Sequence, residues 1–190
     1  MTLRIVAIGG TVNPASTTEM AMRYACRPLS EAGARVDVFG GEYIDALPNY
    51  RGKEYREDHG KELVEAVRVA DGVIIAAPGY HGTVSGVVKN ALDYLEDLAK
   101  DRRPYLDGRA VGLVATAYGD QAAMGTLLTL RSIIHALRGW PTPMGVTART
   151  YQGMFSPEGE CLDDRIRMQL TLVGQQVLQG ASAWSKAGPV

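Results

Sequence analysis

The sequence predicts an α/β fold: a doubly wound, five-stranded parallel sheet in the order 2-1-3-4-5, with helices on both faces. Three observations support this. Short apolar runs alternate with longer segments of helical apolar spacing along the 190 residues. The short runs are apolar at successive positions, which is typical of strands buried on both faces of a parallel sheet. Three of the loops that follow these runs carry glycine, hydroxyl or aromatic residues, as expected where ligands bind at the carboxyl ends of strands.

The first half of the chain is predicted to fold as a strand, a helix, a second strand, a loop and a second helix. Gly33 stops the first helix, because glycine accepts the backbone conformation of a helix end. The loop either reaches over a site or lies in solvent. These elements are, in order, residues 3–8, a helix between Ser16 and Gly33, residues 35–39, the loop at 40–52 and a helix at about 53–70.

The second half is predicted to alternate strands and helices. The segment Trp140-Pro141-Thr142-Pro143 should break a helix, because proline lacks an amide donor. Apolar stripes at 87–98 and 124–137 are wider than one sheet face needs, which predicts a homo-oligomer, a dimer or tetramer. The elements are residues 73–77, a helix at about 85–100, residues 110–115, a helix at about 121–137, residues 144–146, a helix at about 162–179 and a frayed tail at 184–190.

Composition indicates one globular domain over residues 1–190, with 46% hydrophobic and 22% charged residues. A net charge of −1 gives no electrostatic footprint for nucleic acid or an anionic membrane, so neither is expected as a partner. The chain enters its first strand without a signal peptide, and no apolar run approaches the length of a membrane span, so a cytoplasmic location is expected. Cys26 and Cys161 are predicted to be packing residues rather than a disulfide or metal ligands.

The loop after the first strand is rich in hydroxyl groups. It lacks the lysine of a P-loop and the glycine spacing of a dinucleotide fingerprint. Free amides at a helix start, the positive end of the helix dipole and four hydroxyls still predict an anion site. The alternative is a capping box between Ser16 and Glu19, but a cap needs only one hydroxyl. The four hydroxyls belong to Thr11, Ser16, Thr17 and Thr18.

Two later loops are also candidates. Pro78-Gly79-Tyr80-His81-Gly82 follows the third strand, and its glycines would let the backbone approach a flat ligand. The alternative is an ordinary strand-to-helix turn. Thr116-Ala117-Tyr118-Gly119 follows the fourth strand and would lie at the same edge of the sheet.

With these loops in view, the chain resembles the NADPH-dependent FMN reductase family, which has the flavodoxin-like fold, over about residues 3–180. The first loop is similar to the family's Gly-Ser-x-Arg-x-x-Ser phosphate loop, with Thr11 in place of serine and Asn13 in place of arginine. The second loop and the segment 85–93 are similar to the family's Pro-Glu-Tyr-Asn-Gly flavin loop and the helix behind it, with Gly79 and His81 in place of Glu and Asn. The resemblance implies that the cofactor-binding residues are Gly10, Thr11, Asn13, Ser16, Thr17, Thr18, Pro78, Gly79, Tyr80, His81, Gly82, Thr116, Ala117, Tyr118 and Gly119.

The resemblance implies an enzyme that uses FMN, with NADPH or NADH as hydride donor and a small acceptor such as a flavin, quinone or azo compound. Since the cofactor carries the hydride chemistry, no residue is assigned a catalytic role. His81 would form a pH-sensitive hydrogen bond near the flavin, and Tyr94 or Trp140 would reach a neighbouring subunit's site. The alternatives are an FMN-binding electron carrier and a nucleotide-binding module without flavin. A charge of −1 favours the enzyme, because flavodoxin-type carriers are usually strongly acidic.

Overall fold

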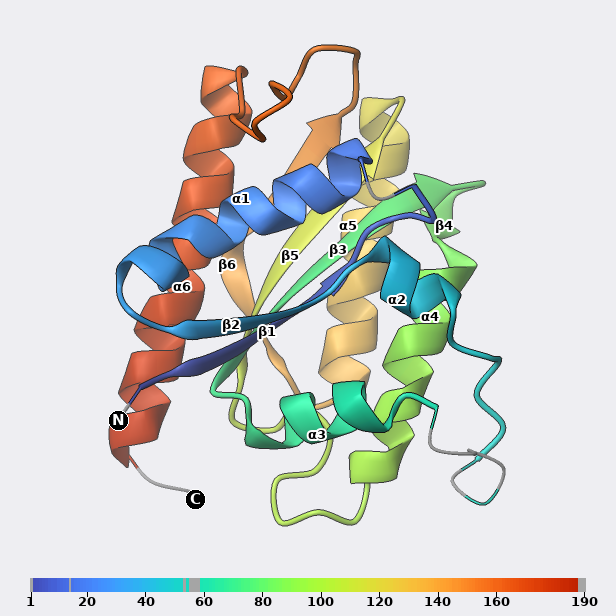
Figure 1. Cartoon of the computed structure of the whole chain (residues 1–190), viewed down its shortest axis with the longest axis vertical. Helices are drawn as coiled ribbons and strands as arrows, with labels where there is room; N and C mark the ends of the chain where they lie inside the picture. Colours follow the sequence, from blue (N-terminus) through green and yellow to red (C-terminus); the bar gives the residue numbers. More distant parts are fainter. Residues whose placement is uncertain (1, 14, 53, 55–58, 188–190) are drawn as a thin grey trace.

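A computed structural model shows a flavodoxin-like α/β fold, with helices packed on both faces of a parallel sheet (Figure 1). It describes residues 2–13, 15–52, 54 and 59–187. The strand order is β2-β1-β3-β5-β6, and β4 pairs antiparallel with β3 at one end. Counting the parallel strands alone along the chain gives 2-1-3-4-5, so the predicted fold class is confirmed.

The central strands form because their residues are apolar at successive positions. All residues of β5 and most of β3 are buried, which matches strands covered on both faces. In β3, Ile74 packs into the core on one face while Val73 and Ile75 pack into the core on the other. The strands are β1 Arg4–Gly9, β2 Arg35–Phe39, β3 Gly72–Tyr80, β4 Thr83–Val84, β5 Ala110–Ala117 and β6 Trp140–Arg149.

Helices α1 and α6 cover one face of the sheet, and the remaining helices cover the other (Figure 1). Their bounds are α1 Thr17–Glu31, α2 Gly41–Asp45, α3 Lys61–Val69, α4 Gly86–Asp93, the 3-10 helix η2 Tyr94–Leu98, α5 Asp120–Ala136 and α6 Asp164–Ala187. No described helix has the length and apolar character needed to cross a membrane.

Strand β6 is longer than predicted, because the prediction recognised only residues 144–146. It begins at Trp140 and includes Pro141 and Pro143. Among the described strands, β6 lies at the edge of the sheet and pairs with β5 alone, so the missing proline donors are tolerated there. The extra length carries β6 to Arg149 and brings the residues after it to the carboxyl edge of the sheet.

Several predicted helix bounds were also wrong. Helix α3 begins at Lys61 rather than near 53, although positions 53 and 55–58 lie outside the described residues. The predicted helix at 85–100 is divided into α4 and η2, and the short helix α2 lies within the predicted loop. Helix α6 continues to Ala187, through much of the expected tail, and 188–190 lie outside the described residues.

The loop at 47–50 packs against α4 through Asn90. The Asn90 side-chain amide donates to the carbonyls of Leu47 and Pro48, at 3.2 and 3.0 Å, and its oxygen accepts from the Tyr50 amide at 2.8 Å. The Tyr94 hydroxyl donates to the Pro48 carbonyl at 2.8 Å. These bonds hold the loop on the body of the protein, rather than over a site or free in solvent.

One argument for an oligomer was wrong. The apolar residues of α4 and η2 pack within the subunit, where Val87 is half-buried and the others are buried, so this stripe needs no second copy to cover it. Tyr94 is 2% exposed and points inward, which excludes the contribution to a neighbour's site that was suggested for it. Trp140 is exposed at the sheet edge, where its ring packs beside that of Trp184. The oligomer itself stays a prediction.

The two cysteines are buried and unbridged, as expected of packing residues. Both belong to the core on the face covered by α1 and α6. Burial raises the pKa of the Cys26 thiol to about 12, although the Arg23 charge opposes this shift. Burial likewise raises the pKa of the Cys161 thiol. Both thiols are therefore protonated at neutral pH.

Candidate functional site

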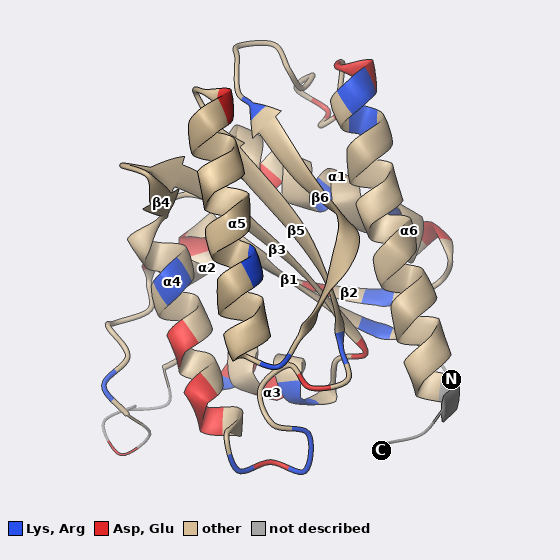
Figure 2. Ribbon diagram, turned by 180° about the vertical axis from the view of Figure 1, so that it is seen from behind, with Lys and Arg blue, Asp and Glu red and all other residues tan. Residues whose placement is uncertain are grey.

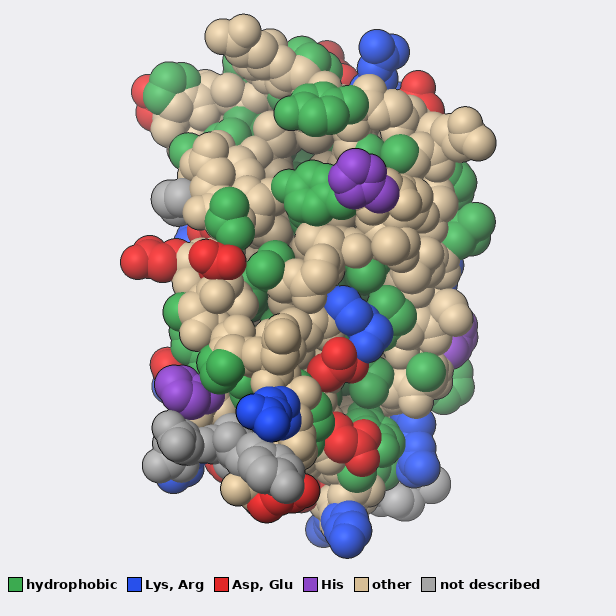
Figure 3. All heavy atoms as spheres, turned by 90° about the vertical axis from the view of Figure 1, so that its right-hand side faces the viewer, with side chains coloured by type: hydrophobic (Ala, Val, Ile, Leu, Met, Phe, Trp, Pro, Cys, Tyr) green, Lys and Arg blue, Asp and Glu red, His purple; other side chains and the backbone are tan. Residues whose placement is uncertain are grey.

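A cleft of about 570 Å³ opens where β1, β3, β5 and β6 end, which is the size of a small-molecule site. We call it the strand-end cleft. In the view of Figure 3, a hollow lies in the upper part of the molecule, with hydrophobic side chains above and below it, in the part that holds these strand ends in Figure 1. The cleft is lined by Thr11, Val12, Asn13, Ala15, Ser16, Thr17, Thr18, Pro78, Gly79, Tyr80, Thr116, Ala117, Tyr118, Thr150, Tyr151 and Gln152.

The structure brings most of the predicted site residues into this cleft, but four do not line it. Gly10 is buried behind the first loop, where its amide donates to the Ala76 carbonyl at 3.3 Å. His81 and Gly82 are exposed beyond the end of β3, and Gly119 caps the start of α5. The role of the fifteen residues in binding flavin stays a prediction.

The first loop presents unpaired donors at the start of α1. The Ser16 hydroxyl oxygen accepts from the Glu19 amide at 3.2 Å, which confirms the predicted cap, and its proton remains able to donate. Within the described residues, no acceptor faces the amides of Thr17 and Thr18 or the Thr17 hydroxyl. Together with the helix dipole, these groups form a donor set suited to a phosphate.

Glu19 does not complete the predicted capping box. Its carboxylate is buried and accepts from the Arg23 side chain at 2.7 Å and from the Gly41 amide at 3.0 Å. A Cβ on Gly41 would lie 1.6 Å from the Thr11 carbonyl oxygen, so only glycine allows α2 to approach the first loop this closely. Glu19 therefore joins α1 to α2 and supports the loop from behind.

A buried hydrogen bond connects the first and third loops. The hydroxyl oxygens of Thr18 and Thr116 lie 2.6 Å apart, and the two residues are 3% and 2% exposed. Either hydroxyl can be the donor. The bond joins residues 98 positions apart and fixes two walls of the cleft relative to each other.

The second loop is a β-hairpin, which the sequence analysis did not predict. Gly79 pairs with Val84 and Tyr80 with Thr83, which leaves His81 and Gly82 as the two-residue turn. Both have positive φ, 50° and 90°, as a type I′ turn requires. His81 thus lies at an exposed tip.

Glycine is needed at position 79 for packing, a role that was not predicted from the sequence. An added Cβ would lie 2.4 Å from the Thr126 hydroxyl oxygen on α5. The absent side chain therefore makes room for the helix that covers β3, rather than only for a ligand. Tyr80 and Tyr118 lie at the rim of the cleft and are 49% and 88% exposed, so their rings are accessible.

Sequence reasoning missed Thr150, Tyr151 and Gln152, which follow β6. Thr150 donates from its amide and hydroxyl to the Ala117 carbonyl, at 2.8 and 3.3 Å, and so holds this segment against the third loop. The same rule that selected the other loops would have selected this one, had the strand been recognised as far as Arg149.

The donor set fits the FMN implied by the resemblance. The phosphate would be held by the amides of Thr17 and Thr18 and by the hydroxyls of Ser16 and Thr17. The flavin ring would lie toward the second and third loops, which form the rest of the same cleft. No described group of His, Cys, Asp and Glu is arranged to hold a metal ion.

Comparison with known proteins agrees with the geometry. A family model described as NADPH-dependent FMN reductase matches residues 3–152. An NADPH azoreductase from Bacillus sp. (strain OY1-2) is 29% identical over 168 residues, which cover 85% of this chain and 84% of that protein. An FMN-dependent NADPH-azoreductase from Staphylococcus haemolyticus is 28% identical over 120 residues, 62% of this chain and 60% of that one.

Solved structures show the same fold. An NADH:FMN oxidoreductase, EMOB, superposes with a TM-score of 0.73 at 24% identity and covers 96% of this chain and 90% of its own. FerB, an NAD(P)H:(acceptor) oxidoreductase from Paracoccus denitrificans, superposes with a TM-score of 0.74 at 14% identity. The match covers 94% of this chain and 99% of FerB. At these identities the structures support the fold alone, whereas the family match spans most of the chain. The chain is an enzyme of the NAD(P)H:FMN oxidoreductase type and belongs to the NADPH-dependent FMN reductase family.

Proposed function

We propose that the protein reduces a small acceptor, such as free flavin, a quinone or an azo compound, at the expense of NADPH or NADH, with FMN held in the strand-end cleft. The observation that carries this proposal is the donor set at the start of α1, which opens into the same cleft as the second and third loops. When bound, FMN supplies the hydride-transfer chemistry.

In this proposal, the residues of the chain bind and orient the FMN and do not exchange protons with the reactants. The described lining of the cleft includes no His, Asp, Glu, Lys or Arg side chain. Amide and hydroxyl donors at Thr17 hold the phosphate end, and the Thr18–Thr116 bond keeps the loops at a fixed separation. The enzyme is therefore expected to work without a dedicated acid or base.

The proposed assembly is a homodimer or tetramer. Helix α5 supports it, because Met124 and Leu128 are 49% and 60% exposed and the ribbon of α5 carries few charged residues (Figure 2). Light scattering at micromolar concentration checks this proposal, and a monomer would contradict it. The cytoplasmic location also stays a prediction.

The test of function is turnover with a panel of acceptors. Purified protein loaded with FMN is given NADPH or NADH, and nucleotide oxidation is followed with free flavin, a quinone and an azo dye in turn. We expect turnover with at least one acceptor, and parallel double-reciprocal lines, because donor and acceptor are proposed to use the same face of the flavin in turn. Tight FMN binding without turnover would indicate an electron carrier instead, and intersecting lines would show that both substrates bind together.

A further inference from the structure

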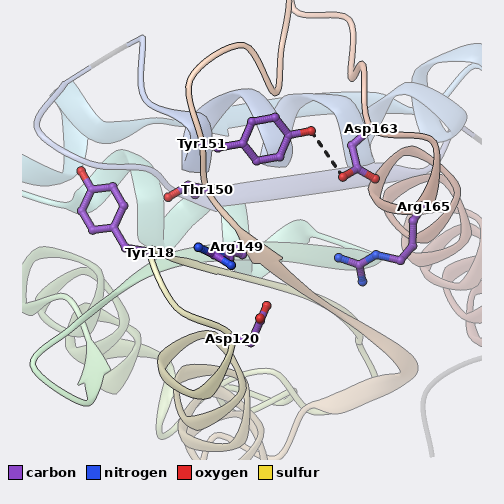
Figure 4. A pocket seen from close by; sticks show the side chains of 7 residues that line it. All are labelled: Tyr118, Asp120, Arg149, Thr150, Tyr151, Asp163 and Arg165. Carbon is purple, nitrogen blue, oxygen red and sulfur yellow. Dashed lines mark hydrogen bonds between the residues drawn. The ribbon is translucent and has the colours of Figure 1, made fainter.

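A second cavity, of about 640 Å³, adjoins the strand-end cleft (Figure 4). The two share Tyr118, Thr150 and Tyr151, so they lie side by side at this end of the molecule. We call the second one the arginine cavity. It is lined by Tyr118, Asp120, Arg149, Thr150, Tyr151, Asp163 and Arg165.

Two arginines from different elements face this cavity. Arg149 ends β6 and Arg165 lies in the first turn of α6, and in Figure 4 the Arg165 guanidinium extends toward the space in front of Arg149. Across the described part of the chain, neither guanidinium has a hydrogen bond or an ion pair, whereas the neighbouring Arg167 pairs with Asp164.

Within the described residues, the acidic residues of the cavity form no ion pair with these two arginines. Asp163 accepts from the Ile166 amide at 3.0 Å and from the Tyr151 hydroxyl at 3.4 Å, so its carboxylate caps α6. Burial and the Asp163 carboxylate raise the pKa of Tyr151, which therefore stays a neutral donor. Asp120 lies on a separate wall, at the start of α5. Two unpaired guanidiniums sharing one cavity are suited to a dianion, because each can form two parallel bonds to phosphate oxygens.

We propose that the arginine cavity binds the adenosine 2′-phosphate end of NADPH, with Arg149 and Arg165 on the 2′-phosphate, and so selects NADPH over NADH. The proposal rests on the function proposed above, since an NADPH molecule that spans the two adjoining cavities would have its nicotinamide end in the strand-end cleft. The exposed ring of Tyr118 offers a surface for the adenine, and Asp120 can accept from a ribose hydroxyl or the adenine amino group.

The first test compares Arg149→Gln and Arg165→Gln with Arg102→Gln, which removes an exposed charge outside both cavities. The readout is the ratio of kcat/KM for NADPH to that for NADH. In each cavity variant the ratio should fall by about ten- to a hundredfold, the loss of a charge-assisted bond, while Arg102→Gln leaves it unchanged. An unchanged ratio in both cavity variants would overturn the proposal.

A binding experiment tests this proposal independently of the proposed function. Calorimetry with FMN-loaded protein compares adenosine 2′,5′-bisphosphate with adenosine 5′-monophosphate. We expect the bisphosphate to bind more tightly to the wild type and to lose that advantage in both cavity variants, whether or not the protein oxidises NADPH. Equal binding of the two nucleotides would refute the cavity as a 2′-phosphate site. A raised KM for a sulfonated azo dye with unchanged NADPH parameters would assign the arginines to an anionic acceptor instead.

Discussion

The hydrogen bond between Thr18 and Thr116 leads to a quantitative prediction. The change is Thr116→Val, which keeps the shape of the side chain and removes its hydroxyl. The Thr18 hydroxyl, in a residue only 3% exposed, then loses its single described partner, 2.6 Å away.

The expected cost follows from leaving a buried hydroxyl unpaired. It amounts to about 1 to 3 kcal/mol of unfolding free energy. With a urea m-value of about 3 kcal/mol/M, the midpoint should fall by about 0.3 to 1 M. Thr18→Val should cost a similar amount. The double variant removes both hydroxyls and should therefore lose less than the two single variants summed, with a coupling of about 0.5 to 3 kcal/mol.

The assay is urea unfolding of the flavin-free protein, followed by tryptophan fluorescence, for the wild type, both single variants and the double variant. Strictly additive losses would refute the pairing of these hydroxyls. Single variants as stable as the wild type would refute the claim that burial makes the bond costly to break.

Three further predictions concern the cleft and the core. Gly79→Val brings a Cβ to 2.4 Å from the Thr126 hydroxyl oxygen and should cost about 1 to 3 kcal/mol in urea unfolding. Gly86→Ala, whose Cβ meets nothing within 4 Å, is the control, and equal stability of the two variants would contradict the packing role. Thr17→Val should lower the affinity for FMN by on the order of ten- to a hundredfold and leave the affinity for riboflavin unchanged, as measured by fluorescence quenching. An equal loss of affinity for both ligands would exclude a phosphate contact. Cys26, whose thiol pKa burial raises to about 12, should resist iodoacetamide in the native protein at neutral pH, and rapid labelling would show that the site opens.

The fold was predictable from sequence where local pattern and tertiary environment agree. The middle strands are apolar at successive positions because helices cover both of their faces, and Val73 to Ala77 shows this directly. The start of β6 was not predictable, because Pro141 and Pro143 usually exclude a strand and are tolerated only since β6 lies at the edge. An edge position is a property of the assembled sheet.

The candidate site was likewise predictable only in part. The first loop was predictable because a cap and its neighbouring hydroxyls lie within a few residues of a helix start. The Thr18–Thr116 bond was not, since only the register of the sheet brings together residues 98 positions apart. Arg149 and Arg165 come from two elements whose ends were misplaced, so no sequence pattern joined them.

Anaerobic stopped-flow mixing of the FMN-loaded protein with NADPH tests whether the strand-end cleft supports hydride transfer. With no acceptor present, we expect the visible absorption band of the bound flavin to disappear in a single turnover and to return when an acceptor is added. A band that stays unchanged after mixing with saturating NADPH or NADH would contradict the claim that the strand-end cleft supports hydride transfer.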